Sequence, residues 1–225
     1  MNQTDQMKRQ SKDLTLGFLL SVLNKERAKL LKKLGFLRKQ GFYLAGGTAL
    51  ALQIGHRTSL DFDFYTERSF DPRKLRGEFD KIFKKVREIY IAEGTLGLEV
   101  DNIMMSFFKY PYPLIKPLQK LEIVDVASLE DIAAMKIIAI SQRGKKRDFI
   151  DTYFLMKILG LREIIEYTKE KYPRFNIYIG LQGLIYFKDA DEDLEKDRFR
   201  LLKDINWKEI KGYIVKETNK ARDML

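Results

Sequence analysis

The apolar positions of the first half of the chain change from helical spacing to strand spacing. Residues 12–40 place apolar side chains at mixed intervals of three and four, which predicts one or two amphipathic helices. The run 42–45 predicts a short strand that ends at Gly46-Gly47. Residues 60–65 alternate between apolar and acidic side chains, which predicts a second strand with the apolar side chains in the core and the acids on the other face.

Helix signals follow each of these strands. Thr48 is predicted to be the N-cap of a helix of small residues that runs from Ala49 to about Ile54. Asp71-Pro72 is typical of a helix start, and helical periodicity continues from residue 72 to residue 86.

The second half of the chain is predicted to be mainly helical. Residues 87–110 predict two or three strands, and the proline-rich segment 110–117 is the best candidate for a subdomain boundary. We expect an α/β (α+β) fold with helices concentrated after this segment. The further predicted elements are helices at 128–142, 146–159 and 161–171, an extended piece at 184–187 and a terminal helix from about Trp207.

Composition narrows the class of protein. The 225 residues are 45% hydrophobic and 33% charged, as in a soluble globular protein. No apolar run approaches the roughly 20 residues that span a bilayer, and the polar first residues lack the apolar region of a secretory signal. The sequence has no cysteine and one histidine, which excludes disulfides, thiolate metal sites and multi-histidine metal sites. These features favour the cytoplasm and no membrane partner.

The net charge of the chain is strongly positive. The 42 Lys and Arg residues against 32 Asp and Glu give a charge of +10, which favours polyanionic partners such as nucleic acid or phosphorylated small molecules. A solvated basic surface without any partner gives the same composition.

The Gly-Gly turn and the acids that follow it suit phosphate chemistry. Gly46 and Gly47 would let the backbone approach an anion closely at the start of a helix, where unpaired N–H groups point outward. Asp61 and Asp63 project from the same side of a strand, and their mutual repulsion favours a cation such as Mg²⁺ between them. Asp-x-Asp alone is more typical of a solvated strand face, but its combination with the preceding Gly-Gly-Thr favours the phosphate site.

A set of ordered motifs resembles the AbiEii/AbiGii toxin family of nucleotidyltransferases. The resemblance extends from Phe42 to about Trp207. The matching segments are YLAGGTALAL (43–52), GHR (55–57), DFDF (61–64), DIAAMK (131–136), RDFID (147–151) and YFKDA (186–190).

This resemblance implies a nucleotidyltransferase-type mixed sheet flanked by helices, with a core at residues 1–118 and a mainly helical domain at 119–225 that completes the nucleotide site. It also implies a toxin that a cognate antitoxin neutralises. Members are described as transferring nucleotides, with tRNA as acceptor in some relatives. Thr48 together with the two glycines would then position the triphosphate of an NTP.

Lys136 is the only charged residue of the segment 132–142 and falls within the apolar stripe of its predicted helix. Because lysine is seldom buried without a partner, we expect an anion beside it, either a triphosphate oxygen or a carboxylate. A lysine whose stem packs while its head reaches water is the alternative. The family resemblance favours the nucleotide.

Two acids of the next predicted helix share one of its faces. Asp148 and Asp151 are three residues apart, and Arg147 can reach Asp151 at the i+4 position. These acids either form a structural ion pair or, as the resemblance implies, complete the nucleotide site or hold Lys136.

Basic residues near these motifs are further candidates. Arg57 could contact phosphate, whereas His56 beside it suits a structural role equally well. The basic cluster 143–147 suits a phosphate or RNA backbone, and also a solvated loop.

One departure from the usual nucleotidyltransferase pattern is visible. These enzymes often carry a third carboxylate on a neighbouring strand as general base. The strand predicted at 103–108 has Ser106 where that acid would stand, and the orientation of Glu99 and Asp101 is open.

We therefore keep two hypotheses. One is an Mg²⁺-dependent nucleotidyltransferase that joins a nucleoside monophosphate from an NTP to an acceptor hydroxyl, such as that of tRNA. The other is a non-catalytic nucleotide- or RNA-binding module on the same fold.

Overall fold

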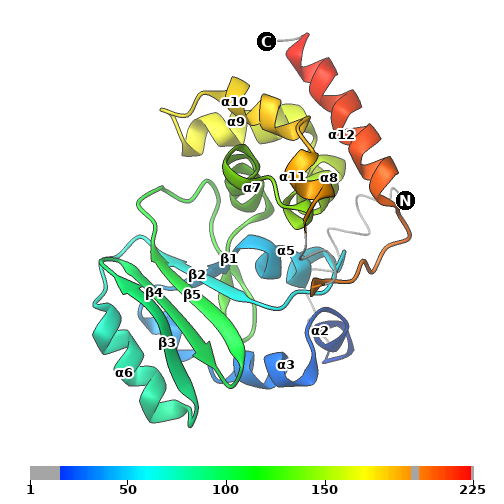
Figure 1. Cartoon of the computed structure of the whole chain (residues 1–225). Coiled ribbons are helices and arrows are strands. Elements are labelled where there is room, and N and C mark those ends of the chain that lie inside the picture. Colours follow the sequence, from blue (N-terminus) through cyan, green and yellow to red (C-terminus); the bar gives the residue numbers. More distant parts are fainter. Residues whose placement is uncertain (1–15, 194–197, 224–225) are drawn as a thin grey trace.

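A computed structural model describes residues 16–193 and 198–223 (Figure 1). The beginning of the helical segment predicted from residue 12 lies outside these residues. Within them, no helix combines the length and the apolar character needed to cross a membrane. The helices are α2 (Leu16–Val22), α3 (Lys25–Lys32), α4 (Phe36–Lys39), α5 (Gly46–Ile54), α6 (Pro72–Ile82), α7 (Leu129–Arg143), α8 (Lys146–Leu159), α9 (Leu161–Lys171), α10 (Ile177–Leu184), α11 (Lys188–Asp191) and α12 (Trp207–Arg222). The strands are β1 (Tyr43–Ala45), β2 (Phe62–Thr66), β3 (Val86–Ala92), β4 (Thr95–Val100), β5 (Ile103–Lys109), β6 (Gln119–Lys120) and β7 (Asp125–Val126).

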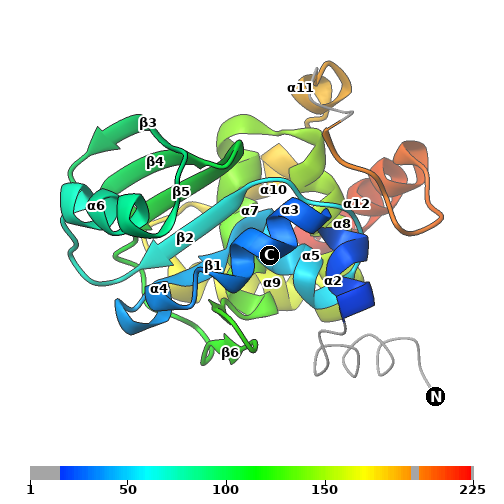
Figure 2. The same cartoon turned by 90° about the horizontal axis from the view of Figure 1, so that it is seen from below.

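The strands form one mixed sheet in the order β3-β4-β5-β2-β1-β7-β6. Strand β2 pairs parallel with β5 and antiparallel with β1, and β1 pairs parallel with β7. Helices flank this sheet, and helices α7 to α12 gather beside it (Figures 1 and 2). The predicted fold class is therefore confirmed. Strands β6 and β7 come from residues after 118, and the division of the chain at that residue stays a prediction.

The two faces of the central strands differ as the alternation predicts. Phe62, Phe64 and Phe107 are fully buried on one face, where the rings of Phe64 and Phe107 stack with centroids 5.4 Å apart. Phe79 of α6 closes this core with its ring edge against Phe107. Leu60, predicted to join the core, is only partly buried, because β2 begins two residues later and the alternation does not extend to it.

The helix after the Gly-Gly turn begins earlier than predicted. Helix α5 starts at Gly46 with Ala45 as N-cap, so the prediction of Thr48 as N-cap is wrong. The Thr48 hydroxyl lies inside the first turn, where it donates to the backbone carbonyl of Asp61 and contacts the hydroxyl of Ser59. These contacts tie the start of α5 to the segment that leads into β2.

Helix α6 is shorter than its periodicity suggests. Asp71 caps its start, as predicted, by accepting hydrogen bonds from the backbone N–H groups of residues 73 and 74. The helix ends at Ile82, because Phe83 is extended and Val86 already pairs with Val100 in the sheet. Apolar residues on both sides of that boundary continue the helical spacing by coincidence.

Helix α10 was not expected, and the extended piece predicted at 184–187 is wrong. Leu184 is the last residue of α10, and Ile185 has a turn conformation with ψ of 3°. The glycines of this segment, which usually interrupt helices, here allow close packing against α7. A Cβ at Gly180 would lie 2.6 Å from the side chain of Ile137.

A buried ion pair fixes the proline-rich segment to the helices. Lys171 of α9 and Asp131 of α7 are both inaccessible to solvent, with Nζ and Oδ1 2.7 Å apart. Lys171 also donates to the carbonyl of Pro113 at 2.7 Å, and Asp131 accepts backbone N–H groups from Ile115 and Lys116. One carboxylate therefore satisfies donors from three parts of the chain.

Replacing Asp131 with alanine is expected to lower the free energy of unfolding by about 3–5 kcal/mol, because Lys171 would stay buried without a counter-ion. Urea unfolding followed by circular dichroism measures this change. The matched control is Asp80→Ala, which removes the exposed i,i+4 partner of Arg76 and should change stability by less than about 0.5 kcal/mol. Equal effects of the two substitutions would contradict a stabilising role of the buried pair of Lys171 and Asp131.

Candidate active site

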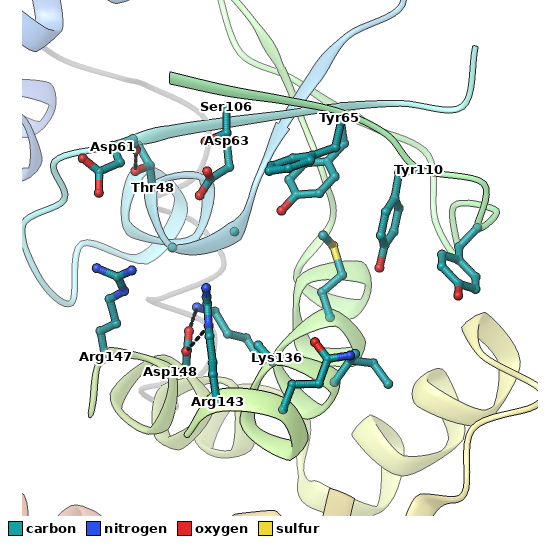
Figure 3. Close-up of a pocket in the computed structure, with 18 of the residues that line it drawn as sticks. Thr48, Asp61, Asp63, Tyr65, Ser106, Tyr110, Lys136, Arg143, Arg147 and Asp148 are labelled. Carbon is teal, nitrogen blue, oxygen red and sulfur yellow. Dashed lines mark hydrogen bonds and ion pairs between the residues drawn. The ribbon is translucent and has the colours of Figure 1, made fainter. Parts of the chain in front are cut away.

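A cavity of about 1220 Å³ lies between the polar face of the sheet and helix α7. The close-up in Figure 3 shows Asp61 and Asp63 on the strand side, with Arg143, Arg147 and Lys136 reaching up from the helices opposite. Acidic and basic groups thus face each other across one space.

Asp61 and Asp63 both line this cavity, as their spacing predicts. Burial raises the pKa of Asp63, and the nearby Asp61 carboxylate raises it further. Two neighbouring carboxylates fit a divalent cation of the Mg²⁺ type, which commonly takes one or two carboxylates together with substrate phosphates.

The Gly-Gly turn accepts no side chain without displacing its neighbours. Gly46 has φ of 68°, which glycine adopts without strain, and a Cβ there would lie 3.3 Å from an oxygen of Asp63. A Cβ at Gly47 would lie 2.1 Å from Nη2 of Arg57. The backbone therefore passes directly beside both a carboxylate and a guanidinium.

The Asp151 carboxylate is the centre of a buried network beneath the turn. The Arg57 guanidinium donates to both of its oxygens, at 2.6 and 2.8 Å. Nζ of Lys136 lies 2.6 Å from Oδ2, and Nε2 of His56 lies 2.7 Å from Oδ1. Burial alone raises the pKa of Asp151, but Arg57 and Lys136 outweigh burial and hold this pKa well below its usual range.

Lys136 connects this network to a second carboxylate. Its side chain is buried, and Nζ donates to Asp148 at 2.7 Å. Arg143 donates to the other oxygen of Asp148 at 3.2 Å. Burial raises the pKa of Asp148, yet Lys136 and Arg143 lower it below its ordinary value. The expected anion beside Lys136 is thus present as two carboxylates.

Arg147 points toward the side of the cavity where Asp61 lies (Figure 3). The sequence indicates that Arg147 can reach Asp151, yet the guanidinium that binds both oxygens of Asp151 is that of Arg57, 94 residues earlier in the chain.

Most of the predicted site residues line the cavity. Asp151 and His56 do not, and both are fully buried behind it. The predicted residues that line it are Gly46, Gly47, Thr48, Arg57, Asp61, Asp63, Lys136 and Asp148.

Sequence reasoning missed Arg198, whose guanidinium lies 3.3 Å from the Asp61 carboxylate. The segment that follows it is bound to the turn before β2. Thr58 donates to the carbonyl of Arg200, and Leu202 donates to that of His56, both at 2.9 Å. Because Arg198 lies outside any long periodic element, its place in the site depends on these tertiary contacts.

Ser106 stands directly beside Asp63 on the neighbouring parallel strand and lines the same cavity. The two acids whose orientation was open lie away from this position: Glu99 pairs with Arg87 at 2.7 Å at the sheet edge, and Asp101 is in the exposed turn after β4. Across the described ranges, no group of three or more acids or histidines is arranged to hold a metal. The strands thus present a two-carboxylate site without a third acid beside it.

Comparison with known proteins assigns the family. Residues 29–223 match the model of the family described as "Nucleotidyl transferase AbiEii toxin, Type IV TA system". The chain belongs to the AbiEii nucleotidyltransferase toxin family. The match covers the cavity and its surrounding helices, and it confirms the resemblance carried by the motifs.

One further protein is similar to this chain in sequence, and two solved structures are similar in fold. An uncharacterised protein of Aquifex aeolicus is 42% identical over 182 residues, which are 78% of this chain and 88% of that protein. MenT4, a nucleotidyltransferase toxin of Mycobacterium tuberculosis, shares the fold at 15% identity with a TM-score of 0.54, over 96% of this chain and 88% of that one. JHP933 of Helicobacter pylori shares it at 17% identity with a TM-score of 0.51, over 94% and 97%.

Two glycine-to-alanine substitutions test the crowding at the turn. Gly47→Ala is expected to lower the free energy of unfolding by about 1–3 kcal/mol. The new methyl group must displace the buried Arg57 side chain, which donates two hydrogen bonds to Asp151. Gly77→Ala, in the interior of α6 with open space around its Cβ, should raise it by about 0.5–1 kcal/mol. Urea denaturation measures both changes. A stabilising Gly47→Ala would show that Arg57 does not approach the turn so closely.

Proposed function

We propose that this AbiEii-family chain transfers a nucleoside monophosphate from an NTP to an acceptor hydroxyl, in an Mg²⁺-dependent reaction. The proposal is carried by one observation: Asp61 and Asp63 face Lys136, Arg143 and Arg147 across a single cavity. This arrangement can bind a cation and a polyphosphate side by side.

Asp61 and Asp63 would hold the metal ion. When bound, Mg²⁺ would offset the charge of the phosphate oxygens and orient them. The Gly46-Gly47 backbone lies beside Asp63 at the start of α5, where outward-pointing N–H groups can contact the phosphates. Thr48 would act indirectly, since its hydroxyl is used to hold the Ser59–Asp61 segment.

Lys136 would neutralise the triphosphate from the opposite side. Its ammonium has three N–H donors, and Asp148 and Asp151 occupy two directions around it. The third can reach a phosphate in the cavity that Lys136 lines. Asp148, Asp151 and Arg57 would then position Lys136 and the turn. This role does not require all three to contact the nucleotide.

The reaction itself needs few groups from the protein. The acceptor hydroxyl would attack the α-phosphorus and release its proton to solvent, the bond to the bridging oxygen of the β-phosphate would break, and pyrophosphate would leave. A basic chain with arginines at the cavity suits an RNA acceptor, and tRNA, the acceptor in some relatives, is one candidate. The family also implies a cognate antitoxin protein as partner and a cytoplasmic site of action.

A non-catalytic nucleotide- or RNA-binding module is the alternative. The position of Ser106 beside Asp63 favours it, because an acid there could accept the proton of the acceptor hydroxyl. The two hypotheses predict the same binding and different chemistry.

Incubation of the full chain with tRNA and each of the four NTPs, labelled at the α-phosphate, tests transfer. We expect label on tRNA with at least one NTP in the presence of Mg²⁺, and none after chelation. Asp61→Asn and Asp63→Asn should each lower the rate about 100-fold or more, because the phosphates would lose their metal.

Glu99→Gln is the matched control, since Glu99 is paired at the sheet edge and should leave labelling unchanged. If no NTP labels tRNA while wild type still binds NTP more tightly than the Asp61→Asn variant, the transferase proposal fails and the binding module remains.

A further inference from the structure

Tyrosine rings line the end of the cavity away from the carboxylates. Tyr65 of β2 and Tyr110 and Tyr112 of the proline-rich segment all line it, and we refer to these three residues as the tyrosine wall. Figure 3 shows Tyr65 and Tyr110 side by side, further along the cavity than Asp61 and Asp63. The short motifs that carry the family resemblance do not contain any of the three.

Ring contacts hold the wall in place. The centroids of Tyr65 and Tyr110 lie 5.2 Å apart, and those of Tyr110 and Tyr112 lie 5.0 Å apart. Tyr172 is buried and lines the same cavity; its ring lies 4.7 Å from that of Tyr112, and its hydroxyl shares a hydrogen bond with the hydroxyl of Tyr110. Such contacts fix the ring planes in advance, so a ligand that packs on them orders few side chains.

Helix α7 contributes apolar side chains to the same cavity. Met135, Ile138 and Ala139 of α7 line it at the i, i+3, i+4 spacing that places them on one helix face. An aromatic wall and an aliphatic helix face that line one cavity suit a flat, uncharged group. Gln142, one turn further along, adds an amide that can bond to the edge of such a group.

The spacing along β2 connects this region to the carboxylates. Tyr65 is two residues after Asp63, on the same face and about 7 Å away along the strand. The pairing of β2 with β5 places a polar and then an aromatic residue side by side on both strands: Ser106 lies beside Asp63, and Phe108 lies beside Tyr65. A phosphate at the carboxylates would therefore place a group one sugar unit away against the wall.

We propose that the tyrosine wall is a nucleobase subsite, in which a purine or pyrimidine ring packs between Tyr65 and the apolar face of α7. The inference rests on the proposed function, because it takes the phosphate position from that function. The base could belong to the NTP or to the terminal nucleotide of the acceptor strand, since both lie one ribose from the reacting phosphorus. Every base has an aromatic face, so stacking alone tolerates different bases.

Calorimetric titration of the full chain in Mg²⁺ tests the subsite. The probes are the four NTPs, inorganic tripolyphosphate and a short single-stranded RNA with a free 3′ hydroxyl. Tyr65→Leu should weaken binding of an NTP or of the RNA about tenfold, because one stacking partner is lost. Tripolyphosphate affinity should stay unchanged, because it reports on the phosphate site alone. A loss confined to NTPs assigns the base to the donor, and a loss confined to the RNA assigns it to the acceptor.

Matched variants separate stacking from folding. Tyr65→Phe keeps the ring and should bind like wild type, and Tyr112→Leu tests the wall at a residue whose side chain is 40% exposed. Tyr178→Leu removes an exposed tyrosine outside the cavity and should change nothing. If Tyr65→Leu and Tyr112→Leu keep wild-type melting temperatures and bind every probe as wild type does, the subsite is overturned. A failed transfer assay would not affect these measurements, which need no product.

Discussion

The buried carboxylate of Asp151 is the constraint on which the site depends. A charge inside a protein is tolerated only when partners replace the water it has lost, and here Arg57, Lys136 and His56 do so together. These partners come from the turn before β2 and from α7, while Asp151 belongs to α8. One carboxylate thus fixes the distance between the sheet and the helices, and with it the width of the cavity.

The geometry of β2 and β5 separates the polar side chains along the cavity from the aromatic ones. Residues two apart on β2 and β5 share a face, so the acids and Ser106 are followed by aromatic rings in the same two rows. The opposite faces of the same strands hold the phenylalanine core, which makes the backbone beneath the site rigid. An ionic end beside an apolar end matches the polarity of a nucleotide.

Local patterns in the sequence predict much of this molecule. The alternation from Asp61 to Phe64 predicts the correct faces of the strand, and the apolar stripe around Lys136 predicts an anion beside this lysine, either a phosphate oxygen or a carboxylate; the structure has two carboxylates there. What escaped prediction depends on contacts between distant residues. Arg57 reaches Asp151 across 94 positions, Arg198 reaches Asp61 across 137, and α10 forms because its glycines fit against α7. The spacing of apolar residues along the sequence does not indicate such pairings.

The contact between the segment after Arg198 and the turn at His56 has a consequence for synthesis of the chain. Proteins emerge from the ribosome with the N-terminus first. Asp61 and Asp63 emerge first, and Lys136, Asp151 and the segment after Arg198 emerge later. A nascent chain therefore lacks the assembled cavity until the residues around Leu202 have left the ribosome. The acidic strand of the site is therefore made well before the helices and the C-terminal segment that complete it.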